Sequence, residues 1–433
     1  MNIYKISPVF LFFIFIFFSK CDSTEPPPPD NRQINLTFED ASCTEVWLNL
    51  ETGNVNFPAE AIIKADDSIA QNIILTNADT IVYVDSLLPN KTYTIQAFIH
   101  SSNQPELPSN KITATTMDTT SHNFTWQTFT FGEHSSSVFY DVAIIDENNI
   151  WAVGEFYMND SLGQHDPNAY NAVHWDGSEW ELERILYDGN IWTITTIFAF
   201  NENDIWFSSF VRFDGENFVE LPIPSILMGW RPNKIWGSSS SDLYVVGNEG
   251  NIAHYQNGQW RKIESGTSLN INGIWGDYNE RANEWEILAV GGNILQSTER
   301  IILQIKKGNQ VQQISSEGTI EYPISGVWFK SGLKYYISGD GMYSNTNLNK
   351  PWQNLSLPNY YGFSIRGQEL NNIVVCGGAG YVGHFNGYTW KNYLDEGLGE
   401  ITGNYYSIAI KGNIISAVGN TAEGEAITVI GKR

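Results

Sequence analysis

Aromatic, acidic and imidazole side chains gather in one polar stretch, residues 155–170, which interrupts a regular alternation of short predicted strands. Long loops on a rigid scaffold are common sites of ligand binding, and these side chains can stack on sugars or hydrogen-bond polar groups. A smaller stretch, residues 278–285, carries a tyrosine and an arginine. The candidate ligand-binding residues are Phe156, Tyr157, Asp160, His165, Asp166, Tyr170, Tyr278 and Arg281. A plain surface loop is the alternative for both stretches.

Motifs for catalysis, metals and cofactors are weak. His174, His254 and His384 precede an aromatic residue at the same place in successive repeats, so they lie about one repeat apart and do not converge on one ion. The glycine string at 378–383 has the spacing of a dinucleotide-binding loop, but a strand and not a helix follows it. No nucleophile elbow, His-Glu-x-x-His or P-loop occurs, and 48 acidic residues leave no carboxylate pair to single out. We therefore assign no catalytic residue, no metal site and no cofactor.

The regular element behind these residues is a four-stranded unit, seen most clearly in residues 234–265. Strands are expected at 235–236, 243–246, 252–255 and 259–263, and Asn257-Gly258 is a strong signal for a tight hairpin between the last two. The second strand recurs seven times and usually ends in glycine; from Gly247 the steps are 44, 48, 38 and 42 residues. One such unit cannot bury both of its faces, so the copies must stack.

Seven copies predict a seven-bladed β-propeller over residues 124–433, with six or eight blades as alternatives because the second and fourth copies diverge. The last copy lacks a fourth strand, and residues 124–131 have the pattern of a fourth strand without a sheet. Pairing of the two would close the ring and remove a free sheet edge. The repeat resembles bacterial secreted propellers of the Kelch or WD40-like kind, a resemblance that implies architecture and not activity.

Residues 34–118 alternate as seven short strands, which predicts a β-sandwich. The stretch 87–95 around Tyr93 resembles the fibronectin type III pattern, in which a tyrosine hydroxyl bonds back to the preceding loop, and Trp47 matches the core tryptophan of that family. The resemblance implies a spacer domain. Residues 119–123 are expected to form a polar hinge, and Cys43 and Cys376, in different domains, are expected to be buried and unpaired.

The N-terminus has the features of a targeting segment. Lys5 precedes an apolar run at 9–18, about half the length that a spanning helix requires. Residues 18–21, Phe-Ser-Lys-Cys, resemble the bacterial lipoprotein cleavage box, which implies a signal peptide at 1–20, a lipid on Cys21 and a proline-rich tether at 21–33. The alternative is an ordinary secretory signal with an incidental cysteine.

These features together predict an exported, lipid-anchored binding protein. The net charge of −24 argues against a nucleic-acid partner, because phosphate binding needs clustered lysine and arginine. We expect the propeller to recognise an extracellular glycan or protein, with the sandwich as a spacer, at the outer membrane of the cell envelope, facing the cell surface or the periplasm. The alternatives are a polysaccharide hydrolase or lyase that uses loop carboxylates, and a structural subunit of a cell-surface complex. The oligomeric state is left open.

Overall fold

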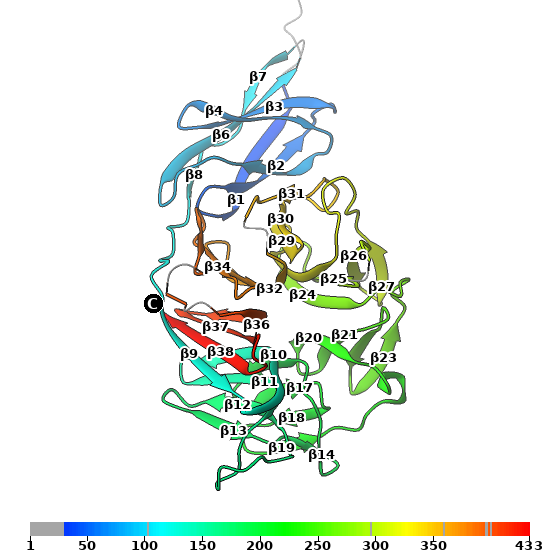
Figure 1. Cartoon of the computed structure of the whole chain (residues 1–433). Coiled ribbons are helices and arrows are strands. Elements are labelled where there is room, and N and C mark those ends of the chain that lie inside the picture. Colours follow the sequence, from blue (N-terminus) through cyan, green and yellow to red (C-terminus); the bar gives the residue numbers. More distant parts are fainter. Residues whose placement is uncertain (1–29, 102–103, 295–296, 358–359, 395–396, 399–400) are drawn as a thin grey trace, which may run out of the picture.

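The computed structural model describes residues 30–433 apart from 102–103, 295–296, 358–359, 395–396 and 399–400. These residues form 38 β-strands and one short 3-10 helix, η1 (Ser225–Leu227), so the prediction of an all-β chain is confirmed. Figure 1 shows a small β-domain resting on a larger ring of sheets. The predicted signal peptide, Cys21 and the tether up to residue 29 lie outside the described residues. Within the described part of the chain, no helix has the length and apolar character needed to cross a membrane.

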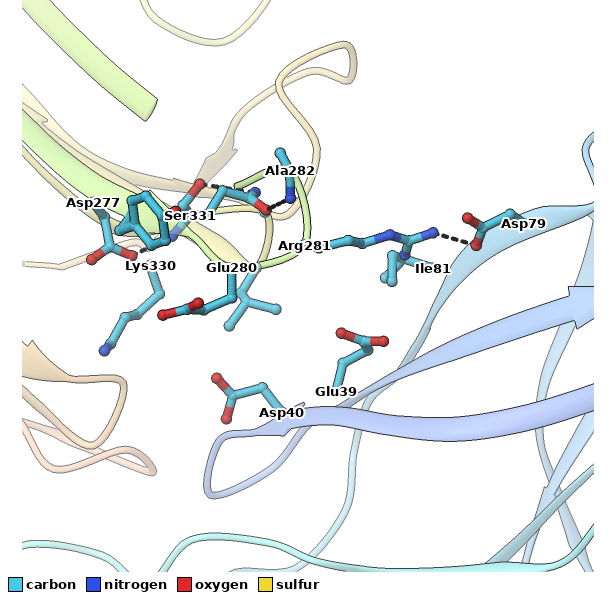
Figure 2. Close-up of a pocket in the computed structure, with 14 residues that line it drawn as sticks. Glu39, Asp40, Asp79, Ile81, Asp277, Glu280, Arg281, Ala282, Lys330 and Ser331 are labelled. Atoms are coloured by element: carbon cyan, nitrogen blue, oxygen red, sulfur yellow. Dashed lines mark hydrogen bonds and ion pairs between the residues drawn. The ribbon is translucent and has the colours of Figure 1, made fainter. Parts of the chain in front are cut away.

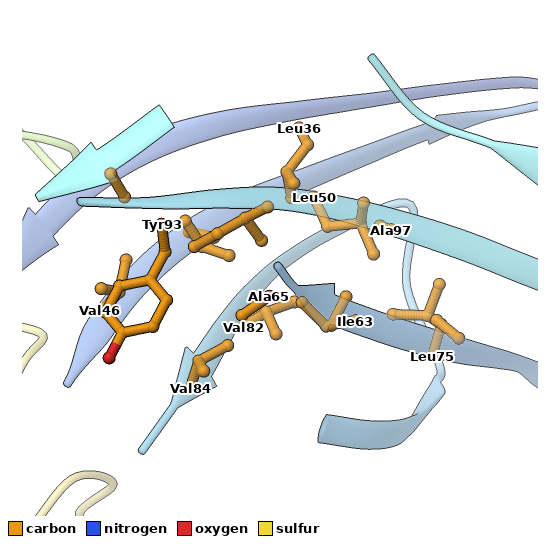
Figure 3. Close-up of a cluster of buried hydrophobic side chains, with 14 of the residues drawn as sticks. Leu36, Val46, Leu50, Ile63, Ala65, Leu75, Val82, Val84, Tyr93 and Ala97 are labelled. Carbon is orange, nitrogen blue, oxygen red and sulfur yellow. The ribbon is translucent and has the colours of Figure 1, made fainter. Parts of the chain in front are cut away.

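The N-terminal domain consists of two β-sheets packed face to face. One sheet has the order β1–β2–β5, and the other has the order β4–β3–β6–β7 with β8 beside β6. Both sheets contribute inward-facing side chains to one core, among them Leu36, Leu50, Ile63 and Ala97 (Figure 3). The eight strands, one more than expected, are β1 (Gln33–Ala41), β2 (Val46–Gly53), β3 (Ala59–Ala65), β4 (Ser68–Leu75), β5 (Asp79–Val84), β6 (Thr92–Ser101), β7 (Gln104–Pro108) and β8 (Ile112–Thr115).

Two aromatic residues of this domain have different roles. The Tyr93 hydroxyl accepts a hydrogen bond from the Leu88 backbone N–H at 2.9 Å, as the sequence predicts. Trp47 was expected in the sandwich core, and that prediction was wrong. Because side chains alternate along a strand, Val46 and its i+2 neighbours face the core while Trp47 points to the other face. There the second domain covers it, and Trp47 is only 1% exposed.

Seven four-stranded antiparallel sheets follow and stand in a ring (Figure 1). Each innermost strand contacts the innermost strand of the next sheet, and β36 contacts β10, so the ring is closed. The first four sheets are β10 (His134–Asp146), β11 (Asn149–Tyr157), β12 (Tyr170–Trp175) and β13 (Trp180–Glu183); β16 (Ile197–Asn201), β17 (Asp204–Phe207), β18 (Val211–Phe213) and β19 (Phe218–Glu220); β20 (Pro232–Ser239), β21 (Asp242–Gly247), β22 (Ile252–Gln256) and β23 (Gln259–Ile263); and β24 (Ile271–Asn279), β25 (Glu284–Gly292), β26 (Arg300–Lys306) and β27 (Gln310–Gln313). The remaining three are β28 (Ile324–Lys330), β29 (Lys334–Gly339), β30 (Gly341–Asn345) and β31 (Gln353–Asn354); β32 (Gly362–Glu369), β33 (Asn372–Gly377), β34 (Val382–Phe385) and β35 (Trp390–Asn392); and β36 (Gly403–Lys411), β37 (Ile414–Thr421), β38 (Ala426–Lys432) and β9 (Thr125–Phe131). A separate hairpin, β14 (Leu186–Tyr187) and β15 (Asn190–Ile191), lies between the first two sheets in the chain.

The seventh sheet takes its strands from both ends of the ring domain. β9 pairs with β38 along its whole length, from Thr125 opposite Lys432 to Phe131 opposite Ala426. Trp126 of β9 packs close to Gly431 and to the ring of Tyr393. The first and last strands of the domain therefore share one sheet, and the free edge of β38 is covered.

A recurrent β-bulge explains the glycine that ends most second strands. In six sheets the innermost strand contains one extra residue, namely Tyr140, Asn233, Asn272, Ser325, Phe363 or Tyr406. A glycine of the second strand lies opposite the residue before the bulge, and a Cβ there would approach a carbonyl oxygen to between 1.8 Å at Gly419 and 2.6 Å at Gly247. The second sheet has Ser209 at the equivalent place, and the pairing of its innermost strand ends before that point, with Ile197 opposite Phe207.

The two domains are held together by buried contacts. Glu45 of the sandwich forms an ion pair with Lys334 at the start of β29, and Trp47 packs beside this pair against Trp328. The expected hinge is also held in place: Thr120 donates to the Asn371 carbonyl at 2.5 Å, and Arg433 donates to the Ser121 carbonyl at 2.6 Å. The linker is therefore hydrogen-bonded to the ring at Thr120 and Ser121.

Candidate functional site

The stretch 155–170 spans the connection between the second and third strands of the first sheet, since β11 ends at Tyr157 and β12 begins at Tyr170. Phe156 is fully buried, stacks on Tyr170 with ring centroids 5.6 Å apart, and belongs to the core of the first and seventh sheets. The Arg184 guanidinium also lies over the Tyr170 ring, 3.9 Å from its centroid. These two aromatic rings serve packing and offer little surface to a ligand.

The polar residues of the same loop mostly hold its own backbone. Asp160 accepts hydrogen bonds from the backbone N–H groups of Leu162 and Gln164, each at 2.8 Å. His165 forms an isolated backbone bridge with Asn159. The backbone N–H of Asn168 and the Arg184 guanidinium together lower the pKa of Asp166, which is ion-paired to Arg184 at 2.5 Å. Asp160 and Asp166 therefore stabilise the loop and are already hydrogen-bonded.

Tyr157 is the member of this group that lines a cavity. Its hydroxyl donates to Glu155 at 2.6 Å, and Glu155 also accepts from Thr193. A hollow of about 400 Å³ lies beside Glu155 and Tyr157, with the hairpin β14–β15 on its other side.

Tyr278 and Arg281 lie at the opposite end of the sheets. They belong to the hairpin between the first and second strands of the fourth sheet, whereas 158–169 joins second to third strands. Asp141 accepts hydrogen bonds from Thr196, Lys234 and Ser407, which occupy equivalent positions of three other innermost strands. Asn233 of β20 donates to the Ile271 carbonyl of β24 at 3.0 Å, beside the bulge in both strands. These innermost strands therefore all run towards the same face of the ring. The structure consequently separates the two groups of predicted ligand-binding residues onto opposite faces.

Arg281 and Tyr278 border a cavity of about 780 Å³ between the sandwich and the ring (Figure 2). Residues of β1 and β5 form one wall, and the hairpins that follow β24 and β28 form the other. The charged residues that line this interdomain cleft are five carboxylates, Glu39, Asp40, Asp79, Asp277 and Glu280, and two cations, Arg281 and Lys330.

Both cations of the interdomain cleft are already paired. Arg281 forms an ion pair with Asp79 across the two domains, and Lys330 lies 3.1 Å from Glu369. Within the described residues, Glu39, Asp40, Asp277 and Glu280 have no ion-pair partner. The cleft therefore carries an excess of negative charge.

Local structure explains how two consecutive acidic residues face the cleft. A β-bulge between Phe38 and Asp40 makes Glu39 an extra residue in β1, so that Glu39 and Asp40 do not alternate across the sheet as regular strand neighbours would. On the other wall, Asp277 is held by the Ser331 backbone N–H, which donates to it at 2.7 Å. Figure 2 shows Glu39, Asp40 and Glu280 extending into the space between the two walls.

Burial raises the pKa of two of these carboxylates, Asp40 and Asp277. Desolvation raises the pKa of Asp40, and the nearby carboxylates of Glu369 and Asp277 raise it further, while Lys330 opposes the change. Desolvation likewise raises the pKa of Asp277, with Glu369 adding to it. A cation placed between them would relieve both the repulsion and the poor solvation.

The sequence did not indicate most of the residues that line the interdomain cleft. It named Tyr278 and Arg281 but not Glu39, Asp40, Asp277 or Lys330. No local signal marks them, because acidic pairs are common in this chain and Asp40 is 237 residues away from Asp277 in the sequence. The doublet Glu39-Asp40 at the end of a predicted strand was the available hint.

The three histidines occupy one repeated structural position. Each third-strand imidazole Nε2 bonds the side chain that opens the neighbouring second strand: His174 to Asn149 at 3.1 Å, His254 to Asp242 at 2.6 Å, and His384 to Asn372 at 3.0 Å. His254 also stacks on Tyr244, with centroids 4.1 Å apart. Within the residues that the structure describes, no cluster of three or more histidine, cysteine or acidic side chains is placed to hold a metal ion.

Comparisons with known proteins identify the architecture of the ring. No protein-family model matches the chain, and no curated protein matches its sequence. The structure "YCF48 bound to D1 peptide" is similar with a TM-score of 0.52 at 15% identity, over 73% of this chain and 99% of that one. The chain contains a β-propeller. "YCF48 from Cyanidioschyzon merolae" (TM-score 0.49, 15% identity, 71% of this chain and 98% of that one) and "Structure of Dos1 propeller" (0.46, 11%, 71% and 94%) are more distant.

Proposed function

We propose that this protein is a non-catalytic binding protein that recognises a basic segment of an extracellular protein in the interdomain cleft. The observation that carries the proposal is a set of four carboxylates, Glu39, Asp40, Asp277 and Glu280, that have no ion-pair partner among the described residues and line a cavity of about 780 Å³. Lysine or arginine side chains of a partner would supply the missing charge and form charge-assisted hydrogen bonds. The YCF48 complex with D1 peptide is a precedent for a propeller that binds a peptide.

In this proposal the sandwich is more than a spacer. It contributes Glu39 and Asp40 to the cleft, and the buried contact of Trp47 with the propeller keeps the two walls at a constant separation. A preorganised cleft loses less entropy when a ligand binds.

We further propose that the seven sheets are seven blades and that the sandwich is a fibronectin type III domain. The strand order β1–β2–β5 against β4–β3–β6 and the bond from Leu88 to the Tyr93 hydroxyl support the second assignment.

A lipid on Cys21 would hold the protein at the outer membrane, facing the cell surface or the periplasm. Radiolabelled palmitate should be incorporated by the wild type and not by Cys21→Ser; equal labelling of both would overturn the anchor.

Binding of a hexalysine peptide to residues 30–433, measured by isothermal titration calorimetry, tests the cleft. We expect Asp40→Asn/Asp277→Asn to weaken binding about tenfold or more, because two charge-assisted contacts are lost. The matched control is Glu202→Gln/Glu216→Gln, which removes the same charge from exposed turns of the second sheet and should change the Kd less than about twofold. Equal weakening by both pairs would assign the binding to net charge alone and overturn the proposal.

A polysaccharide hydrolase is the second candidate, because Asp40 and Asp277 both have a raised pKa and a protonated carboxyl can act as a general acid. A screen of bacterial and host polysaccharides for reducing-end release separates the two functions. Turnover that Asp277→Asn abolishes would replace the binding function by catalysis.

A further inference from the structure

The innermost strands of the propeller enclose a cavity of about 220 Å³ on the ring axis. Six of the seven innermost strands contribute to its wall, and most of the wall is apolar, as at Ile235, Ile274 and Ile408. Three charged residues interrupt the apolar lining: Asp141, Lys234 and Arg366.

Arg366 breaks the repeat at its own position. Register places it opposite Val374 of the second strand, and the equivalent innermost residues in the other six sheets are all uncharged. They are Ala143, Phe198, Trp236, Trp275, Trp328 and Ala409. Since the position packs sheets together everywhere else, an arginine here needs a separate reason.

Asp141 is not an ion-pair partner of Arg366, because both of its carboxylate oxygens already accept hydrogen bonds from other residues. Oδ1 accepts from Lys234 Nζ at 2.5 Å and from Ser407 Oγ at 2.7 Å. Oδ2 accepts from Thr196 Oγ1 at 2.7 Å and from the Ile197 backbone N–H at 3.0 Å. One buried carboxylate thus serves one buried cation and ties four sheets together.

Arg366 keeps an uncompensated charge. Its Nη1 donates to the backbone carbonyls of Ile365 at 2.8 Å and Val327 at 3.2 Å, and its guanidinium lies over the Trp275 ring at 5.4 Å. In the described part of the chain, no carboxylate lies within ion-pair distance of it. Desolvation lowers the pKa of Arg366, although the charge of the nearby Asp141 opposes the change.

We propose that the axial cavity is a binding site for one small carboxylate, held by Arg366. A guanidinium offers a planar fork of donors that matches a carboxylate, and only one fork nitrogen is engaged by the backbone. The bound group is a free monocarboxylic acid or the terminal carboxylate of a protein chain, since both present the same chemistry and a cavity of this size admits one end group. The site is independent of the interdomain cleft, which selects the opposite charge.

Thermal unfolding of residues 30–433 in rising sodium acetate tests the proposal, with acetamide as the neutral analogue. We expect acetate to raise the melting temperature saturably by a few degrees and acetamide to leave it unchanged. Arg366→Met should abolish the saturable shift. Arg261→Met is the matched control, because it removes the same charge from the exposed outer strand β23 and should retain the shift.

Further measurements keep the test decisive if Arg366→Met folds poorly. Arg366→Lys keeps the charge but not the fork, so its acetate Kd should rise about tenfold. A short peptide that binds as the free acid but not as the C-terminal amide would identify a chain end as the ligand, whereas acetate binding alone would identify a free acid. A shift that is absent in the wild type, or equally large in Arg366→Met, would overturn the site.

Discussion

At the residue scale, the propeller contains a buried pair of opposite charges. Lys234 and Asp141 lie 2.5 Å apart on the ring axis, and the lysine side chain is 13% exposed against 2% for the aspartate. Lys234 and the hydrogen bonds from Ser407 and Thr196 hold the pKa of Asp141 below its usual value although desolvation opposes them. Removing either partner alone would leave a poorly solvated charge, so the pair stabilises the fold when both partners are present.

We predict that Lys234→Met lowers the free energy of unfolding by about 3–5 kcal/mol, the usual effect of leaving a buried charge without its partner. Lys411→Met, at an exposed strand end, should change it by less than about 0.5 kcal/mol. Urea titration gives both values. The double variant Asp141→Asn/Lys234→Met should lose less than the sum of the single changes, and strict additivity would contradict a direct interaction.

A second residue-scale feature is a pair of neutral histidines between linker and propeller. The Nδ1 atoms of His122 and His384 are 2.8 Å apart, so one must donate and the other accept. Burial, then His122 and Arg433, lowers the pKa of His384 to about 3. In the unfolded chain the same group titrates near 6.5, so the unfolded state binds more protons between these values and stability falls as the pH is lowered.

We predict that lowering the pH from 7 to 5 costs about 2 kcal/mol through His384, on the linkage between the two pKa values. Urea unfolding at both pH values measures the loss. His384→Gln should flatten this pH dependence, while His100→Gln, at a partly exposed position in β6, should not. An unchanged slope in His384→Gln would place the titration elsewhere.

At the scale of the element, the outer strand β9 decides whether the ring stays closed. It pairs with β38 over its whole length and anchors there through Trp126, which packs on the Tyr393 ring at 5.0 Å. The close approach of Trp126 to Gly431 leaves no room for a side chain on that glycine. The strand is thus attached by one large aromatic contact in addition to its backbone hydrogen bonds.

We predict that Trp126→Ala lowers the free energy of unfolding by about 3 kcal/mol, the lower end for loss of a large aromatic side chain because Trp126 is only partly buried. Trp192→Ala is the control, since Trp192 is 53% exposed and should contribute less than about 1 kcal/mol. Hydrogen exchange should also speed up in β9 and β38 of Trp126→Ala. Unchanged exchange there would show that the backbone pairing alone closes the ring.

At the scale of the whole molecule, the sandwich and the propeller form one unit. Trp47 lies in a cluster with Trp328 and Tyr336, and Lys334 pairs with Glu45 beside them. The interdomain cleft exists only while this contact persists, because its walls belong to different domains. Binding at the cleft and docking of the domains are therefore coupled.

We predict that Trp47→Ala lets the sandwich move relative to the propeller, because the buried anchor of the interface is removed. Small-angle scattering should report a larger radius of gyration, and hexalysine should bind more weakly. Trp192→Ala, at an exposed position that does not line the interdomain cleft, should change neither. An unaltered scattering curve for Trp47→Ala would show that Glu45 and the linker suffice for docking.

Much of the architecture follows from local patterns. The repeat of short strands with a glycine after the second predicts the propeller, and the structure confirms it, because bulge and glycine are neighbours within one sheet. The Asn257-Gly258 hairpin is confirmed as well, with both residues at positive φ. The count of seven blades, the fibronectin type III assignment and the lipid on Cys21 stay predictions.

The functional surfaces, in contrast, depend on contacts between distant parts of the chain. Alternation along β2 predicts that Trp47 and Val46 face opposite sides, but only the docked propeller determines which side is covered by protein. The interdomain cleft brings Asp40 to Asp277, and the axial cavity brings Lys234 to Asp141. The amino-acid sequence predicts the spacing of residues within one strand or hairpin. The distance between residues of different elements depends instead on how whole sheets pack, which only the tertiary structure determines.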